Sequence, residues 1–257
     1  MTGVGVSVLF VVGIILVSEI LRKIGSFSNE FTRKFIHIGV SHWWLVAMYY
    51  IGGIGYALLP PILFVALNYI SYKKDLIKSM ERGKDTSDLG TVYFPISLIA
   101  LILLTWEGGL LGADYSYLGA LGVLIMGYGD GFAAILGKNF GRHGYRVYNN
   151  EKTLEGSLGM FAFSFIVSAI VLGNFLGFNL HNMKISFAIA VISTLAEALT
   201  PFGFDNISVP LVSALGAYYL IFVAGETAFS FIYLASIGFL FSRSEEHTSE
   251  LQSHHDL

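Results

Sequence analysis

The sequence contains no cysteine, and only 13% of its 257 residues are charged. The absence of cysteine excludes disulfides, thiolate catalysis and cysteine-ligated metals. An ordinary soluble domain has about 25% charged residues. The low charge, 54% hydrophobic residues and a mean hydropathy of +0.67 therefore predict an integral membrane protein. The sequence has no G-x-x-x-x-G-K-S/T phosphate loop and no internal repeat.

The formal net charge of −3 arises in the last 15 residues. Residues 1–242 carry 14 basic and 14 acidic residues, so bulk charge gives no indication of a nucleic-acid partner. The segment 243–257 resembles a translated sequencing-adapter read-through. We expect it to be a non-native tail, the alternative being a short polar cytosolic tail.

Long apolar runs fill most of residues 1–242, and a spanning helix needs about 20 such residues. We count nine candidate segments, and because several are short we expect an all-α, polytopic transmembrane bundle of about 7–9 membrane helices in one domain. The candidate segments are about 3–21, 35–51, 54–72, 92–106, 117–137, 157–177, 185–200, 207–223 and 226–242.

Thirteen of the 15 lysines and arginines fall in the alternate loops 22–34, 73–91 and 138–156. The positive-inside rule places these loops in the cytoplasm and the N-terminus outside, as expected for a prokaryotic cell membrane. No basic leader precedes the first segment, so we do not expect a cleaved signal peptide. Aromatic residues near segment ends are predicted to be interfacial anchors, namely Trp43, Trp44, Tyr49 and Tyr50.

Asp130 ends an apolar run and stands between Gly129 and Gly131. Flanking glycines allow another backbone or a ligand to approach closely. A carboxylate near membrane depth is costly and usually functional, although a hydrogen-bonded packing role is the alternative.

The loop 138–156 after Asp130 combines glycines with four cations, namely Lys138, Arg142, Arg146 and Lys152. These cations could bind either phosphates or lipid headgroups. The loop leads into Thr153, Glu155, Gly156 and Ser157. We expect a helix to begin at Ser157, whose hydroxyl could be an N-cap or, with the free N–H groups there, a phosphate donor.

Four further polar residues could belong to a functional site or could have only a structural role. Asp205 and Asn206, between two apolar segments, could contact a metal or nucleotide or could form a turn. Glu197 could join that site or pair with a cation inside the bundle. His37 follows Arg33 by four residues, so both can share a helical face; His37 could steer a headgroup, transfer a proton or simply pack.

The motifs together resemble those of CTP-using membrane lipid enzymes. The matching elements are Asp130-Gly131-Phe132-Ala133-Ala134, Gly137-Lys138, Gly141-Arg142 and Lys152-Thr153-Leu154-Glu155-Gly156-Ser157. Two more favour the dolichol kinase, phytol kinase and CTP-dependent diacylglycerol kinase group. They are Arg33-Lys34-Phe35-Ile36-His37 and Asp205-Asn206-Ile207-Ser208-Val209-Pro210. The resemblance runs from about residue 32 to residue 212.

This resemblance implies a kinase that phosphorylates a lipid alcohol (polyprenol, dolichol, phytol or diacylglycerol) with CTP and Mg²⁺ at the cytoplasmic membrane edge. Asp130 and Asp205 would be metal ligands and, with Lys152, catalytic residues. Nucleotide contacts would come from Lys138, Arg142, Lys152, Thr153, Glu155, Gly156, Ser157 and Asn206, and lipid or headgroup contacts from Arg33, Lys34 and His37. The general base stays open among Asp205, Glu155 and Glu197. A phosphatidate cytidylyltransferase is the alternative, and a transporter is a third interpretation.

Overall fold

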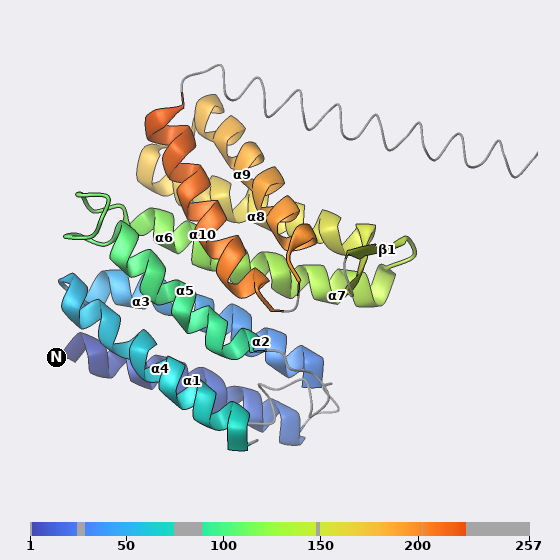
Figure 1. Ribbon diagram of the computed structural model, residues 1–257, viewed down its shortest axis with the longest axis horizontal. Coiled ribbons are helices and arrows are strands. Elements are labelled where there is room, and N and C mark those ends of the chain that lie inside the picture. Colours follow the sequence, from blue (N-terminus) through green and yellow to red (C-terminus); the bar gives the residue numbers. More distant parts are fainter. Residues whose placement is uncertain (1, 25–28, 75–88, 148–149, 202, 225–257) are drawn as a thin grey trace, which may run out of the picture.

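The computed structural model describes residues 2–24, 29–74, 89–147, 150–201 and 203–224 (Figure 1). These ranges form a helical bundle with one short β-hairpin. Its helices are α1 (Thr2–Ile24), α2 (Asn29–Ser41), α3 (Trp43–Tyr50), α4 (Ile54–Lys74), α5 (Gly90–Thr105), α6 (Ser116–Ile125), α7 (Gly131–Phe140), α8 (Leu154–Leu176), α9 (Leu180–Leu199) and α10 (Asp205–Tyr218), with π-helical segments η1 (Met126–Asp130) and η2 (Tyr219–Val223).

The predicted all-α membrane bundle is confirmed. Six helices in the described ranges are long and apolar enough to cross a membrane, and α6, η1 and α7 together form one of them, 25 residues long. Eight of the nine predicted segments are helical, but 35–51 is divided at His42 into α2 and α3. The segment 226–242 and the tail 243–257 lie outside the described residues.

Three helix boundaries are marked by basic residues at one end of the molecule. Arg22 and Lys23 lie in the last turn of α1, Lys73 and Lys74 in that of α4, and Lys138 in that of α7. Figure 1 shows the C-terminal ends of these three helices on the side away from the N-terminus, where the hairpin also lies. The predicted concentration of positive charge on one face is therefore seen in the fold.

The loop 138–156 contains a β-hairpin that the sequence did not predict. Strands β1 (Gly144–Val147) and β2 (Asn150–Thr153) pair antiparallel. The expectation that the next helix begins at Ser157 was wrong, because α8 begins at Leu154 and Thr153 is its N-cap. The Thr153 hydroxyl accepts the Gly156 N–H at 3.1 Å, and this bond starts the helix one turn earlier.

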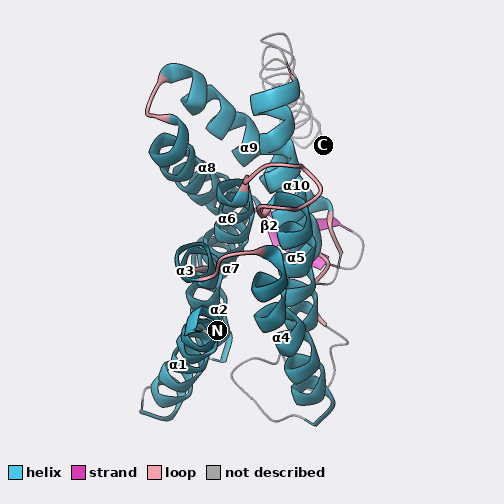
Figure 2. Cartoon of the chain, turned by 90° about the vertical axis from the view of Figure 1, so that its left-hand side faces the viewer, coloured by secondary structure: helices cyan, strands magenta, loops and turns pink. Residues whose placement is uncertain are grey.

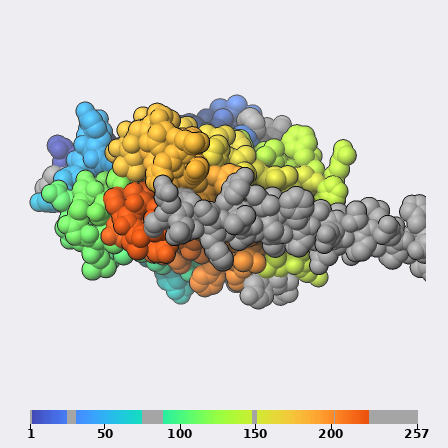
Figure 3. Space-filling view, turned by 90° about the horizontal axis from the view of Figure 1, so that it is seen from above, coloured from blue at the N-terminus to red at the C-terminus, as the bar shows by residue number. Residues whose placement is uncertain are grey.

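A turn at Asp205 and Asn206 was one of two interpretations that the sequence left open, and the structure does not show it, because these residues form the first turn of α10. An acidic residue is stabilised there by the positive end of the helix dipole. α9 precedes α10 in the chain and packs against both α8 and α10, and Figure 2 shows α8 and α10 beside α6. Figure 3, from above, shows α8 and α9 in yellow to orange at the molecular surface.

The tryptophans form part of the core. Trp43 and Trp44 are fully buried and Trp106 nearly so, so the prediction that Trp43 and Trp44 are interfacial anchors was wrong. Trp44 Nε1 donates a hydrogen bond to the Ser116 carbonyl at 2.9 Å, and its ring meets that of Trp106 edge-on at 5.5 Å. The polar edge of Trp44 is thus satisfied inside the bundle.

Gly127, inside η1, allows α2 to pack directly against this segment. A Cβ atom at Gly127 would lie 2.3 Å from Ser41 Oγ. We therefore expect Gly127→Ala to destabilise the protein by about 1–3 kcal/mol through overpacking. Gly5→Ala in α1 is the matched control, since a Cβ atom there meets nothing within 4 Å. Thermal unfolding in detergent measures both, and equal melting temperatures would contradict the packing described.

Candidate functional site

The helix that carries Asp130 is locally widened where the carboxylate emerges. The segment η1 is a π-helical turn of five residues that ends at Asp130. Single π-helical turns inside α-helices are frequent at functional sites. A Cβ atom at Gly129 would lie 2.5 Å from Met160 Sδ of α8, and one at Gly131 would lie 2.8 Å from the Ile38 side chain of α2. The flanking glycines thus let α2 and α8 approach Asp130, as the sequence predicted.

Asp130 forms a buried ion pair with Lys34. The Lys34 ammonium lies 2.5 Å from Asp130 Oδ2, and the two side chains are only 2% and 14% exposed. His37, one turn further along α2, places Nε2 3.7 Å from the same oxygen. Arg33, Lys34 and His37 were grouped in the sequence as lipid or headgroup residues. In the structure, Lys34 and His37 face Asp130.

A second buried ion pair joins Lys152 to Glu197. The Lys152 ammonium lies 2.6 Å from Glu197 Oε1 and also donates to the Glu197 backbone carbonyl. The two side chains are 15% and 10% exposed. Because Lys152 is on β2 and Glu197 is near the C-terminal end of α9, this contact anchors the hairpin to the bundle. Glu197 thus pairs with a cation inside the bundle, as one interpretation expected, and it also lies close enough to Asp205 for the two charges to interact.

Asp205 lies between the two pairs. Its carboxylate interacts electrostatically with Asp130, Lys34, Lys152 and Glu197, and Oδ1 accepts hydrogen bonds from the Asn206 backbone and side-chain amides. We call these five residues (Lys34, Asp130, Lys152, Glu197 and Asp205) the charged cluster. The fold thus brings Asp130, Lys152 and Asp205, from three distant parts of the sequence, to one site.

The charged cluster contains no ready-made metal cage. The described ranges hold no group of three or more His, Cys, Asp or Glu side chains that could bind a metal ion by themselves. Asp130 Oδ2 is engaged by Lys34, and in the described part of the chain Oδ1 has no hydrogen-bond partner. Magnesium is usually held by one or two carboxylates together with substrate phosphates. A magnesium ion that arrives with a nucleotide would need no more than two carboxylates, and Asp130 and Asp205 are two whose charges interact in this fold.

The remaining predicted nucleotide residues lie around the hairpin. Lys138 and Arg142 are exposed at the end of α7, and neither forms an ion pair with another described residue. Among the described residues the Thr153 hydroxyl accepts from Gly156 and donates to none, so its proton is available to another acceptor. The side chains of Lys138 and Arg142 and the Thr153 hydroxyl are therefore not committed to partners within the described part of the chain.

Two other predicted residues are engaged by the hairpin itself. Glu155 Oε1 lies 2.8 Å from His143 Nδ1, and Ser157 Oγ lies 2.6 Å from the Tyr145 hydroxyl. These bonds fix the hairpin on the first turn of α8. His143 and Tyr145 were not predicted as site residues, because their contacts depend on a strand register that the sequence did not reveal.

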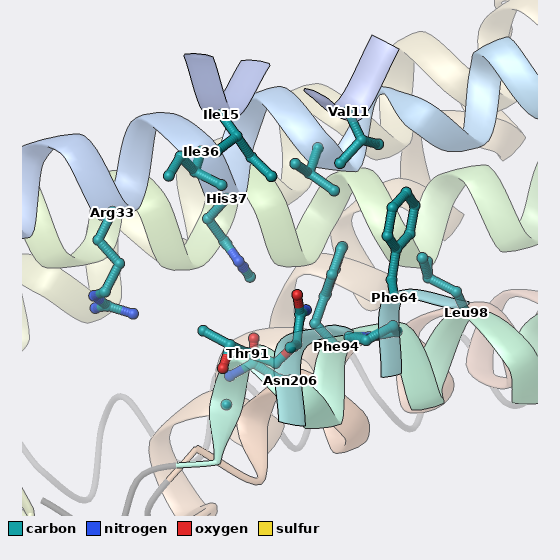
Figure 4. A pocket seen from close by; sticks show the side chains of 14 residues that line it. Val11, Ile15, Arg33, Ile36, His37, Phe64, Thr91, Phe94, Leu98 and Asn206 are labelled. Atoms are coloured by element: carbon teal, nitrogen blue, oxygen red, sulfur yellow. The ribbon is translucent and has the colours of Figure 1, made fainter. Parts of the chain in front are cut away.

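A cavity of about 80 Å³ opens beside the charged cluster, between α1, α2, α4, α5 and α10 (Figure 4). Its polar wall includes Arg33, His37 and Asn206, three residues predicted from the sequence. Asn68 and Thr91, which were not predicted, complete that wall, and the Asn68 side-chain amide donates to the Thr91 carbonyl at 2.7 Å. The opposite wall is apolar and consists mainly of Val11, Ile15, Phe64, Phe94 and Leu98.

Several curated proteins similar to this chain are named as kinases of phytol or farnesol. The chain is 30% identical over 220 residues to a phytol kinase of Synechocystis sp., which covers 84% of this chain and 90% of that protein. It is 28% identical to phytol kinase 1 of Arabidopsis thaliana, over 80% of this chain and 71% of that one. It is also 28% identical to an Arabidopsis farnesol kinase, over 78% and 68%. No family model and no solved structure matches the chain.

The buried pair of Lys34 and Asp130 yields a stability prediction. Lys34→Met leaves the Asp130 carboxylate buried without its cation, which we expect to cost about 3–5 kcal/mol. Adding Asp130→Asn removes the uncompensated charge, so the double variant should recover most of the lost stability. Chemical unfolding in detergent measures the four proteins of this cycle. Additive losses in the double variant would contradict a direct pairing.

Proposed function

Because the chain belongs to the phytol kinase family, we propose that it transfers the γ-phosphoryl group of CTP to the hydroxyl of a lipid alcohol and releases CDP. The family relatives are named for phytol and farnesol, which are both single-chain isoprenoid alcohols. An alcohol of this class is our proposed acceptor. The polytopic membrane fold places the protein where such an alcohol is dissolved.

One observation carries the proposal: a charged cluster suited to a triphosphate adjoins a cavity with an apolar wall. His37 and Asn206 line that cavity, while His37 lies 3.7 Å from Asp130 and Asn206 bonds to Asp205. A phosphoryl transferase must bring a polar donor and an apolar acceptor together at one point. The shared wall is the place where these two environments meet.

In phosphoryl transfer, the protein mainly positions the reacting groups and stabilises the charge on the phosphoryl oxygens. Lys152, Lys138 and Arg142 would neutralise phosphate charge, and the Thr153 hydroxyl would donate to a phosphate oxygen. Asp130 and Asp205 would hold a magnesium ion, which supplies charge neutralisation on the phosphoryl oxygens when bound. Lys34 then keeps the Asp130 carboxylate in place between turnovers.

The choice of CTP as donor is supported by the sequence element from Lys152 to Ser157. That element resembles the one shared by CTP-using lipid enzymes, and it lies at the end of β2 and the start of α8. We propose that CTP approaches from the face that carries the basic helix ends, which the positive-inside rule assigns to the cytoplasm.

A product assay distinguishes the kinase from a cytidylyltransferase. Purified protein is given CTP labelled in the γ-phosphate with phytol, farnesol, diacylglycerol or phosphatidate, the last being the acceptor that a cytidylyltransferase needs, and ATP replaces CTP in a parallel reaction. We expect label in the phosphorylated alcohol and one CDP per product. Release of pyrophosphate without CDP would overturn the kinase proposal, and turnover with ATP but not CTP would overturn the choice of donor.

Asp205→Asn tests the site. Asp205 belongs to the charged cluster, and its carboxylate forms no ion pair with another described residue. Its loss should lower kcat by at least about 100-fold, a typical cost of removing one transition-state charge contact. The fold should be retained, since no buried cation loses its only partner. The control is Lys184→Ala, an exposed cation on α9 far from the hairpin in sequence, which should keep wild-type kcat. Equal rates for the two variants would contradict the assignment.

A further inference from the structure

The cavity beside the charged cluster has a polar end and an apolar end. Figure 4 shows His37, Thr91 and Asn206 at one end, with Phe64 and Leu98 at the other. The His37 ring also packs against Phe94, with ring centroids 5.0 Å apart. A cavity of this kind suits a molecule with one hydroxyl group on an apolar chain.

His37 presents an unused hydrogen-bonding atom at this polar end. Its Nε2 atom is fully buried and has no hydrogen-bond partner among the described residues. An imidazole nitrogen donates or accepts a hydrogen bond according to its tautomer, so either a donor or an acceptor can satisfy Nε2.

A buried polar atom without a partner is costly, so native proteins rarely retain one without a reason. The charged groups that act on His37 are Arg33 and Lys34 from its own helix and Asp130 from η1. None of these forms a hydrogen bond with Nε2 within the described ranges, and Asp130 Oδ2 lies 3.7 Å away. The neighbouring cavity is therefore the natural source of a hydrogen-bond partner for Nε2.

We propose that this cavity is the acceptor site, and that the hydroxyl of the bound alcohol forms a hydrogen bond with His37 Nε2. The inference rests on the proposed kinase function and adds the location and orientation of the acceptor. The alcohol oxygen then lies beside Asp130, where the donor phosphates are expected. The apolar chain runs past Phe94 and Leu98 towards Val11 and Phe64.

The size of the cavity limits what it recognises. A volume of about 80 Å³ is room for roughly three water molecules, so it accommodates the hydroxyl end and the first carbons of the chain. The remainder of the chain must leave the cavity. Exposed apolar side chains on α1 and α4, such as Leu16 and Leu67, extend the apolar surface towards the bilayer.

Binding without nucleotide tests the acceptor site independently of catalysis. A diazirine analogue of farnesol is photo-crosslinked to wild-type protein, and labelled peptides are identified. We expect label on α1, α4 and α5, competed by excess farnesol. Label confined to surfaces outside these helices would overturn the site. If this labelling succeeds while CTP turnover is absent, the proposed function fails and the binding site stands.

A pair of substitutions on α5 tests the same site through kinetics. Leu98→Trp fills the cavity from its apolar wall, whereas Ile96→Trp adds the same ring on an exposed part of the helix. We expect Leu98→Trp to raise KM for farnesol at least 10-fold with KM for CTP unchanged, and Ile96→Trp to change neither. Equal KM values for farnesol in two folded, active variants would overturn the inference and leave the kinase function intact.

The hydrogen bond itself is tested by removing either of its partners. Wild-type protein should bind farnesol about 10-fold more tightly than the matching hydrocarbon without the hydroxyl, a typical effect of one buried hydrogen bond. His37→Leu should bind farnesol and the hydrocarbon about equally tightly. His42→Leu is the matched control, since His42 bonds to Tyr128 and the Ile38 carbonyl and does not line the cavity. A preserved preference in His37→Leu would overturn the assignment of His37.

Discussion

The buried contact between Lys34 and Asp130 organises the candidate site. Both charges lie inside a helical bundle whose surroundings are largely apolar, so each depends on the other for stability. The contact also fixes geometry, because it joins α2 to the π-helical turn that ends at Asp130. With α2 held there, Arg33 and His37 are carried to the wall of the adjacent cavity.

The second ion pair has a complementary structural role. Lys152 reaches from the hairpin to the end of α9, so a polar segment outside the apolar core is held against the bundle. The charges of both pairs act on the carboxylate of Asp205 at the start of α10. The proposed nucleotide site is thus built from the ends of several helices, whereas the proposed acceptor cavity lies deeper between them. This division matches the different solubilities of a nucleotide and a lipid alcohol.

Properties that depend on local sequence were predicted well. The apolar runs marked eight helical segments, and the glycines around Asp130 indicated a close approach by neighbouring helices, which the structure shows. The likeness of the motifs to lipid-alcohol kinases also agrees with the relatives found. Each of these signals resides within one segment, so it can be read without knowing how the segments pack.

Properties that depend on packing could not be predicted in the same way. Trp43 and Trp44 are of a residue type that often anchors a protein at the membrane interface. In the structure, both side chains of α3 are buried in the core, and Trp44 donates a hydrogen bond to the Ser116 carbonyl. Lys34 and Asp130 are 96 residues apart, and nothing local indicates that they meet. The β-hairpin is short and polar, and its pairing is held by contacts such as that between Tyr145 and Ser157. In all three cases the outcome depends on contacts between separate segments of the chain.

Metal binding in the presence and absence of nucleotide tests most directly the claim that the charged cluster holds a metal-bound triphosphate. Mn²⁺ replaces magnesium, and its electron paramagnetic resonance signal is recorded with purified protein, with and without a non-hydrolysable CTP analogue. Because only two carboxylates of the cluster, Asp130 and Asp205, are proposed as metal ligands, we expect protein-bound Mn²⁺ only when the nucleotide is present, and its loss in Asp130→Asn. Equally tight Mn²⁺ binding without nucleotide, or binding unaffected by Asp130→Asn, would contradict the claim.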